Sequence, residues 1–247
     1  MSNLYTNLSS VYEAMYKSFI DYEAEYVFYS NILLSNNSKS LIEIGCGSGN
    51  LTSRFVNNGF YYIGIDLSEE MLTLAKTNNP TAVFVKEDMR NFNLEKQVDA
   101  IIITGRTISY LLSNNDVVDT FASIYKNLNN NGIVVFDCID ASKFIPQIDA
   151  AKKVVHNASF NNKHYQRDSI WKVNLANGFC FDWASIYYEK SENDELTIIG
   201  EDNSTIRTFT KDEMLLFLTL TGFTIKEIIE RPSYAFDTFV LITQKIS

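Results

Sequence analysis

The sequence predicts an α/β fold: a doubly wound, mostly parallel sheet with helices on both faces, and an antiparallel β insertion over it. Up to residue 140, short continuously apolar segments alternate with segments of helical period, as expected for parallel strands buried on both faces. Residues 141–208 instead alternate apolar and polar side chains, which is typical of half-exposed antiparallel strands. Helix and strand patterns resume in residues 209–247 and complete the sheet, for which we expect seven strands.

The first half of the chain is expected to hold two strand–helix units behind an N-terminal helical segment. Residues 3–34 place apolar and aromatic side chains at helical spacing, and the polar residues 35–39 end that pattern. A strand over 40–44 meets glycines before a helix over 51–58, which stops at Gly59. A strand over 61–66 then leads into a helix over 69–78, with Ser68 as its N-cap.

The remaining elements are predicted from the same two patterns, continuously apolar segments for strands and apolar residues at helical spacing for helices. Strands are predicted over 82–85 and 100–103, a helix over 116–128, a turn over 129–132 and a strand over 133–137. After the insertion come a helix over 211–221, ended by Gly222, and strands over 224–230 and 238–245. We expect a single domain over 1–247: a cap (1–34), a core (35–140 and 209–247) and the insertion (141–208) as a lid for a substrate.

The charge of the chain favours a small-molecule partner. Its 247 residues carry 21 Lys and Arg against 30 Asp and Glu, a net charge of −9, which disfavours nucleic acid and anionic membranes. No basic leader or long apolar span is present, so a cytoplasmic protein is expected, as a monomer or homodimer. Three dispersed cysteines and two histidines, without ligand spacing, predict neither disulfides nor a bound metal.

A glycine-rich turn follows the first predicted strand. Glycines in residues 43–49 (EIGCGSG) permit a sharp turn and the close approach of a ligand to the N-terminus of the next helix. Asp66 ends the second strand, where a carboxylate can accept hydrogen bonds from both hydroxyls of a ribose. Asn50 stands where the G-x-G-x-x-G fingerprint of dinucleotide binders has its third glycine, so an NAD-dependent oxidoreductase is disfavoured.

Three segments together resemble the successive motifs of class I S-adenosylmethionine-dependent methyltransferases: residues 43–49, residues 64–72 (GIDLSEEML) and residues 86–90 (KEDMR). The resemblance covers most of residues 1–140 and is weaker in residues 207–213 and the helix after them. It implies a Rossmann-like fold. The layout is most similar to small-molecule enzymes such as the N,N-dimethyltransferases of amino sugars, which share a tyrosine-rich cap and a β-rich insertion.

The resemblance implies S-adenosylmethionine as the cofactor and S-adenosylhomocysteine as its product. Asp66 would bind the ribose, Leu67 and Met71 would pack on the adenine, and Asp88 and Met89 would meet its amino edge. Glu43 would orient the glycine loop, and three cap tyrosines would close over the cofactor. The full set of implied cofactor-binding residues is Tyr5, Tyr12, Tyr22, Glu43, Gly45, Cys46, Gly47, Gly49, Asp66, Leu67, Met71, Asp88, Met89 and Thr104.

The substrate side is implied to include Arg106, Tyr110 and Trp183, with Tyr110 as the candidate catalytic residue. Two of them have an alternative interpretation: Arg106 selects an anionic acceptor or pairs with a surface acid, and Trp183 walls the pocket or packs inside the insertion with Trp171, Phe179 and Phe181. Met71 and the cap tyrosines could equally be packing residues. If the acceptor is a hydroxyl, the candidates for a general base are Tyr110, His156, His164 and Asp182.

We therefore predict methyl transfer to a nitrogen or oxygen of a small-molecule acceptor by in-line displacement, which demands alignment more than acid–base chemistry. A non-catalytic regulator or partner subunit that binds S-adenosylmethionine is the alternative. An amino-methylating enzyme of nucleic acids is disfavoured, because residues 104–107 (TGRT) replace the Asn/Asp-Pro-Pro-Tyr/Phe segment of such enzymes. The sequence leaves open the acceptor and the number of methyl groups transferred.

Overall fold

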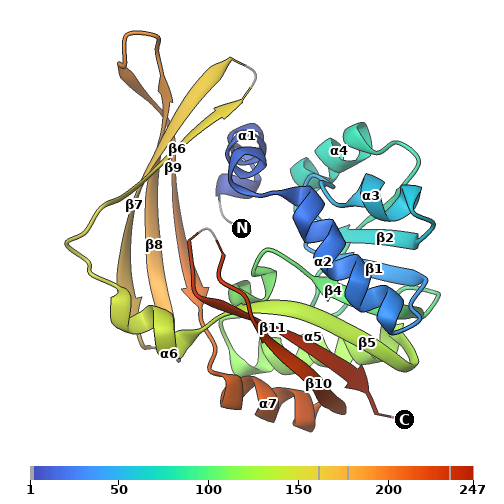
Figure 1. Ribbon diagram of the computed structural model, residues 1–247. Helices are drawn as coiled ribbons and strands as arrows, with labels where there is room; N and C mark the ends of the chain where they lie inside the picture. Colours follow the sequence, from blue (N-terminus) through green and yellow to red (C-terminus); the bar gives the residue numbers. More distant parts are fainter. Residues whose placement is uncertain (1–2, 161, 177, 234, 247) are drawn as a thin grey trace.

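The computed structural model describes residues 3–160, 162–176, 178–233 and 235–246, and contains a seven-stranded sheet of order β10-β11-β5-β4-β1-β2-β3 (Figure 1). Strand β11 runs antiparallel to β5 and β10, and the other adjacent pairs are parallel. The predicted fold class is confirmed. The strands are β1 (Ser40–Ile44), β2 (Tyr61–Asp66), β3 (Val83–Lys86), β4 (Val98–Ile103), β5 (Leu128–Ile139), β10 (Phe223–Glu230) and β11 (Thr238–Lys245).

Helices cover both faces of this sheet because successive strand residues point to opposite faces and both sets are apolar. On one face, Ile101, Ile103 and Phe136 pack with α5 (Asn114–Asn127) and α7 (Lys211–Leu220). On the other, Ala100 and Ile102 pack with α2 (Tyr22–Ser35) and α3 (Thr52–Asn57).

The helix starts use the side-chain caps that short polar residues provide. Ser68 caps α4 (Glu69–Asn78) by accepting a hydrogen bond from the backbone N–H of Met71, as predicted. Ser113 and Asp116 form a reciprocal capping box on α5. The predicted turn over 129–132 lies instead within β5, where Asn131 has a φ of 62°.

The insertion holds a second sheet of order β6-β7-β8-β9, which stands beside the core in Figure 1. Its antiparallel strands are β6 (Val154–Phe160), β7 (Lys163–Asn174), β8 (Cys180–Lys190) and β9 (Leu196–Arg207). The first residues after Asp140 are helical rather than extended, as α6 (Ala141–Phe144) and the 3₁₀ turn η3 (Ile145–Gln147). Asp140 starts this helical segment by accepting a hydrogen bond from the backbone N–H of Ser142.

The N-terminal helical segment divides between the two sheets. After η1 (Asn3–Tyr5), helix α1 (Ser9–Phe19) packs against the insertion, where Leu8 and Met15 share an apolar cluster with Ala158 and Tyr187. Helix α2 packs on the large sheet instead. The segment therefore joins the insertion to the core along one side of the site described below. Among the described residues, the helices are too short or too polar to cross a bilayer.

Candidate functional site

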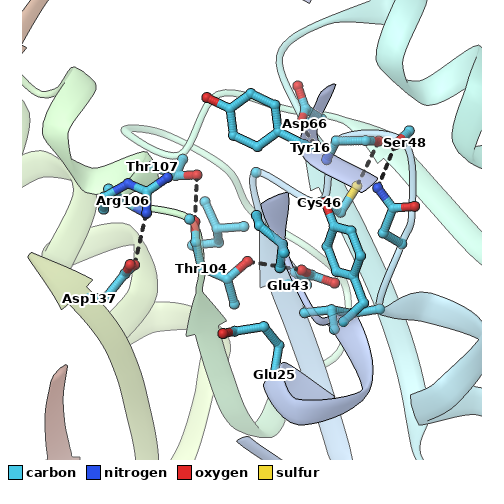
Figure 2. A pocket seen from close by; sticks show the side chains of 18 of the residues that line it. Tyr16, Glu25, Glu43, Cys46, Ser48, Asp66, Thr104, Arg106, Thr107 and Asp137 are labelled. Atoms are coloured by element: carbon cyan, nitrogen blue, oxygen red, sulfur yellow. Dashed lines mark hydrogen bonds between the residues drawn. The ribbon is translucent and has the colours of Figure 1, made fainter. Parts of the chain in front are cut away.

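A cavity of about 530 Å³ lies at the carboxyl ends of β1, β2, β4 and β5, where open α/β sheets bind ligands. Its roof comes from η1, α1 and α2, and one end is closed by the segment after β10. Figure 2 shows acidic side chains and the Arg106 loop converging on it. Of the predicted site residues, the cavity is lined by Tyr5, Tyr12, Tyr22, Glu43, Gly45, Cys46, Gly47, Asp66, Leu67, Asp88, Met89, Thr104, Arg106 and Tyr110.

The glycine loop has the backbone shape that the motif predicts. Gly45, Gly47 and Gly49 have φ values of 70°, 53° and 76°, in the left-handed region that favours glycine. The backbone N–H groups of Gly45 and Cys46 both donate to the Ile65 carbonyl, at 2.8 and 3.1 Å, which ties the loop to β2. A Cβ on Gly45 would lie 2.6 Å from the Thr107 side chain, so only glycine fits at this position.

Asp66 joins the two motifs at the end of β2. Its Oδ2 accepts a hydrogen bond from the Gly47 backbone N–H at 2.8 Å, and its Oδ1 accepts one from the Ser68 N–H at 2.9 Å. Burial raises the pKa of this carboxyl, and the backbone donors oppose that rise. The carboxylate also lines the cavity, as expected for a residue that meets a ribose.

Glu43 is nearly fully buried at the floor of the cavity, with a 3% exposed side chain. The Tyr62 hydroxyl donates to Oε2 at 2.6 Å, and the Thr104 hydroxyl donates to Oε1 at 3.2 Å. Figure 2 shows the Thr104 contact. Burial raises the pKa of Glu43 to about 7, against the lowering effect of the two hydroxyl donors.

Tyrosines from the N-terminal segment close the cavity from above. Tyr5 and Tyr110 share a hydrogen bond of 2.7 Å between their hydroxyls, which links η1 to the segment after β4. Tyr12 stacks on Tyr16 with ring centroids 4.1 Å apart. Burial raises the pKa of Tyr110, so its hydroxyl stays protonated at neutral pH and can orient a ligand but cannot serve as a ready base.

Three predicted site residues lie outside the cavity lining. Gly49 faces Asn79, because a Cβ there would meet the Asn79 amide at 2.7 Å. Met71 is buried behind the loop, its Cε 3.3 Å from the Cβ position of Gly47, which matches its alternative as a core residue. Trp183 belongs to the aromatic cluster of the insertion with Phe144, Trp171, Phe181 and Phe236, because its strand turns this face toward α6.

Tyr110 is also the only base candidate that lines the cavity among the described residues. His156 lies on β6 beside Arg167, and burial with this neighbouring charge lowers its pKa to about 4. His164 begins β7 and shares a hydrogen bond with Ser159 at 2.8 Å. Asp182 lies on β8 and accepts hydrogen bonds from Asn174 and Thr205 on the two neighbouring strands.

The end of the cavity near β5 holds charged residues that sequence reasoning did not select. Asp137 accepts a hydrogen bond from the Arg106 backbone N–H at 2.8 Å, and Arg231 binds Glu25 with both terminal nitrogens at 2.8 Å (Figure 2 shows Glu25 and Asp137). Asp137 is the last residue of the strand predicted over 133–137, and this position could have identified it as a candidate site residue. Glu25 and Arg231 are 206 residues apart, and no sequence spacing connects them.

Arg106 is buried and lines the cavity, so it does not lie on the surface as its second alternative assumed, and selection of an anionic acceptor stays a prediction. It is 9% exposed, has a φ of 64°, and its guanidinium lies 5.3 Å from the Phe236 ring centre. Its neighbouring acid, Asp137, is buried rather than on the surface. The positive charge of Arg106 opposes the rise in the pKa of Asp137 that burial causes.

Residues 41–132, which contain the glycine loop, Asp66 and Asp88, match the family described as methyltransferase domain. Over this segment the chain is similar to methyltransferase domains, in agreement with the predicted enzyme class. Within the matched segment, β1 and β2 contribute residues to the cavity lining, and the match includes the lining residues of the loops after β1, β2, β3 and β4.

Two named relatives each match about half of the chain. The chain is similar to the Bacillus subtilis protein YqeM, with 31% identity over 136 residues, 53% of this chain and 52% of that protein. It is 29% identical over 119 residues to a Streptomyces venezuelae dTDP-3-amino-3,4,6-trideoxy-alpha-D-glucopyranose N,N-dimethyltransferase, covering 47% of this chain and 50% of that enzyme. The chain thus spans about half the length of both relatives.

The fold likeness extends over the insertion as well. The structure of the Micromonospora echinaspora amino pentose methyltransferase CalS10, solved with S-adenosylmethionine bound, has a TM-score of 0.78 to this chain at 18% identity. The alignment covers 95% of this chain and 96% of that one. The second sheet and the N-terminal helices of the chain are therefore part of the shared fold.

Proposed function

We propose that this chain transfers a methyl group from S-adenosylmethionine to a small-molecule acceptor, with an amine nitrogen as the receiving atom. The observation that carries the proposal is a single cavity that joins the glycine loop and Asp66 at one end to Arg106, Tyr110 and Asp137 at the other. A cofactor and an acceptor can meet inside such a cavity with water excluded, which in-line displacement requires.

The cofactor supplies an activated methyl group on a sulfonium, so the protein has to bind, align and exclude water. The glycine loop and Asp66 hold the nucleoside, and Glu43 offers a carboxylate to the methionyl ammonium. Tyr5, with its hydroxyl on that of Tyr110, covers the reacting region. In the transfer, the amine nitrogen forms a bond to the methyl carbon as the carbon–sulfur bond breaks, sulfur becomes a neutral thioether, and the new ammonium releases a proton to water.

The charge of the cavity favours an amine over a hydroxyl. Acidic side chains outnumber basic ones in its lining, with Asp21, Glu25, Glu43, Asp66, Glu87, Asp88 and Asp137 against Arg106 and Arg231. A cavity lined by an excess of one sign of charge raises the local concentration of the opposite charge, so a cationic cofactor and a protonated amine are both attracted, and the amine releases its proton to water before its nitrogen attacks the methyl carbon. None of the cavity-lining residues in the described ranges is a histidine that could act as a base for a hydroxyl.

Asp137 is the side chain that we assign to the acceptor amine. It is 8% exposed and lines the cavity, and its Oδ1 accepts the hydrogen bond from the Arg106 backbone N–H. Register places Asp137 beside Thr104, the first residue after the neighbouring strand β4, since Ile103 pairs with Phe136. Two strand spacings separate β5 from β1, which is about 10 Å, so the acceptor and the methionyl end of the cofactor would lie side by side.

The first experiment is calorimetric titration of the purified protein with S-adenosylmethionine, S-adenosylhomocysteine and NADH. We expect micromolar binding of the first two and none of NADH. Transfer from methyl-tritiated cofactor is then measured with matched amine and hydroxyl compounds, starting with dTDP-3-amino-3,4,6-trideoxy-glucose and its 3-hydroxy counterpart. Labelling of hydroxyl compounds alone would overturn the amine assignment, and cofactor binding without transfer to any acceptor would favour a non-catalytic regulator.

A further inference from the structure

Tyr62 lies just outside the cavity but touches the carboxylate at its floor. The ring is on β2, 4% exposed, and packs among the apolar side chains of the sheet face that α2 and α3 cover. Its hydroxyl is 2.6 Å from Glu43 Oε2 and 3.0 Å from the hydroxyl of Thr52, the first residue of α3. A polar chain therefore crosses an otherwise apolar layer and ends at the cavity.

The direction of this chain is determined by its hydrogens. Thr52 donates its hydroxyl hydrogen to Tyr62 Oη, so the single hydrogen of Tyr62 is available for Glu43. Thr104 donates to the other carboxylate oxygen from the opposite side. Glu43 thus receives one hydroxyl hydrogen on each oxygen, an arrangement that stabilises the charged carboxylate over the protonated acid.

We propose that Tyr62 is a positioning residue that keeps Glu43 ionised and aimed into the cavity, so that Glu43 binds the ammonium of the methionyl end of the cofactor and makes that binding depend on pH. This inference rests on the proposed function, because it needs a cofactor with a methionyl group. It goes beyond that function by assigning a role to a residue that does not touch the cofactor and by predicting a pH range for binding.

The sign of the pH dependence follows from the groups around Glu43. Burial raises its pKa to about 7, so the carboxyl is largely protonated below that pH and cannot attract an ammonium. Binding of the ammonium favours the ionised form, so affinity rises as pH rises toward 7 and then levels off. The hydrogen bond from Tyr62 lowers the pKa of Glu43. Loss of this hydrogen bond would therefore move the increase in affinity to higher pH.

Other titratable groups face Glu43 and have to be separated from it. The negative charge of Asp66, at the end of β2, raises the pKa of Glu43, and burial raises the pKa of the neighbouring Cys46 thiol well above the usual range. Burial raises the pKa of Tyr29 on α2 well above the usual value, and the negative charges of Glu25 and Glu43 raise it further. Asp66 titrates in the same direction as Glu43, so pH dependence alone does not identify Glu43.

The experiment therefore compares two ligands that share the nucleoside. S-Adenosylhomocysteine has the methionyl-type ammonium, while 5′-methylthioadenosine has the same adenosine and thioether without it. The ratio of their affinities cancels the contribution of Asp66 and reports the ammonium. Calorimetry between pH 5.5 and 7.5 should show that the preference for S-adenosylhomocysteine grows with pH up to about 7.

Tyr62→Phe keeps the ring and its packing and removes the hydrogen bond. We expect the affinity ratio at pH 7 to fall about tenfold, the scale of a hydrogen bond to a charged group, and its rise to move to higher pH. Tyr61→Phe is the matched control, since Tyr61 is the residue of β2 that precedes Tyr62 and is half exposed on the opposite face. Thr52→Val, which removes only the donor to Tyr62, should give a smaller change in the same direction and guards against a folding defect in Tyr62→Phe.

Each outcome decides the proposal. A ratio that responds to Tyr62→Phe but not to Tyr61→Phe supports it. Equal loss for both ligands in Tyr62→Phe would show a general role in loop structure and overturn it, as would a ratio independent of pH in the wild-type protein. If the wild-type protein binds neither ligand, the proposed function itself fails, and that result is distinct from an unchanged ratio with both ligands bound.

Discussion

The two ends of the cavity are built in different ways. The end formed by β1 and β2 is held mainly by hydrogen bonds of backbone groups. The N–H groups of Gly45 and Gly47 donate to the Ile65 carbonyl and the Asp66 carboxylate, which lie about 20 residues further along the chain. At the end near β5, side chains from distant elements meet, as in the pair of Glu25 and Arg231. A site made from backbone and adjacent loops can be found in a sequence motif, whereas one made from distant side chains depends on the whole fold.

Gly45→Ala should have the largest effect, because it breaks the backbone-built end. The left-handed φ costs a non-glycine residue about 1–2 kcal/mol, and the clash with Thr107 adds to that cost. We expect the free energy of unfolding to fall by about 2–4 kcal/mol, measured by urea denaturation, with loss of S-adenosylhomocysteine binding.

Gly59→Ala is the control for that change. Gly59 has a similar left-handed φ of 85°, but an added Cβ there meets nothing within 4 Å. It should therefore show the backbone cost alone and leave ligand binding intact. Equal destabilisation by the two substitutions would mean that the loop yields to the Gly45 side chain, and that close approach does not explain this glycine.

Asp66→Ala tests the same end of the cavity without adding any atoms that could clash. We expect affinity for S-adenosylhomocysteine to fall about 100-fold by calorimetry, because a ribose contact and the Gly47 hydrogen bond are both removed, while the melting temperature stays close to that of wild type. Asp88→Ala should cost much less, since Arg90 already binds the Asp88 carboxylate at 2.6 Å and holds its pKa below the usual value. The reverse order of the two losses would contradict the assignment of Asp66.

Asp137→Asn addresses the end near β5. The amide oxygen can still accept the hydrogen bond from Arg106, so the loop should remain in place. The lost charge should lower kcat/KM for the amine acceptor about thirtyfold, within the range for a hydrogen bond to a charged group, and change S-adenosylhomocysteine affinity less than about twofold. A matching loss of cofactor affinity would place Asp137 on the cofactor side of the cavity.

Tyr110→Phe should have a smaller effect than Asp137→Asn. Because burial keeps the Tyr110 hydroxyl protonated, its removal takes away an orienting hydrogen bond rather than a base, so turnover should fall about fivefold with little change in cofactor affinity. Tyr5→Phe breaks the same Tyr5–Tyr110 hydrogen bond but leaves the Tyr110 hydroxyl in place, and it should be milder. If Tyr5→Phe is equally damaging, the closure of the N-terminal segment matters, rather than the Tyr110 hydroxyl.

Most elements of the large sheet could be predicted because their signals are local. Apolar strands over 40–44, 61–66 and 238–245 match β1, β2 and β11, and the Ser68 cap was visible from residue type and position. The helical segment at 141–147 was missed, because only four residues of α6 follow its Asp140 cap and so short a stretch has no readable period. Strand β5 also extends through residues expected to form a turn.

The order of the elements, the glycine loop and the position of Asp66 can be read from the amino-acid sequence, because each depends on residues near one another in the chain. The folded chain was needed to show that Trp183 packs in an aromatic cluster with Phe181 and Phe236, that Met71 lies behind the loop, and that Tyr62 reaches Glu43. It was also needed to show that Glu25, Asp137 and Arg231 share a cavity. The physical reason is that burial and charge pairing depend on which faces of distant elements meet, and periodicity states only that a residue faces inward, not what it meets there.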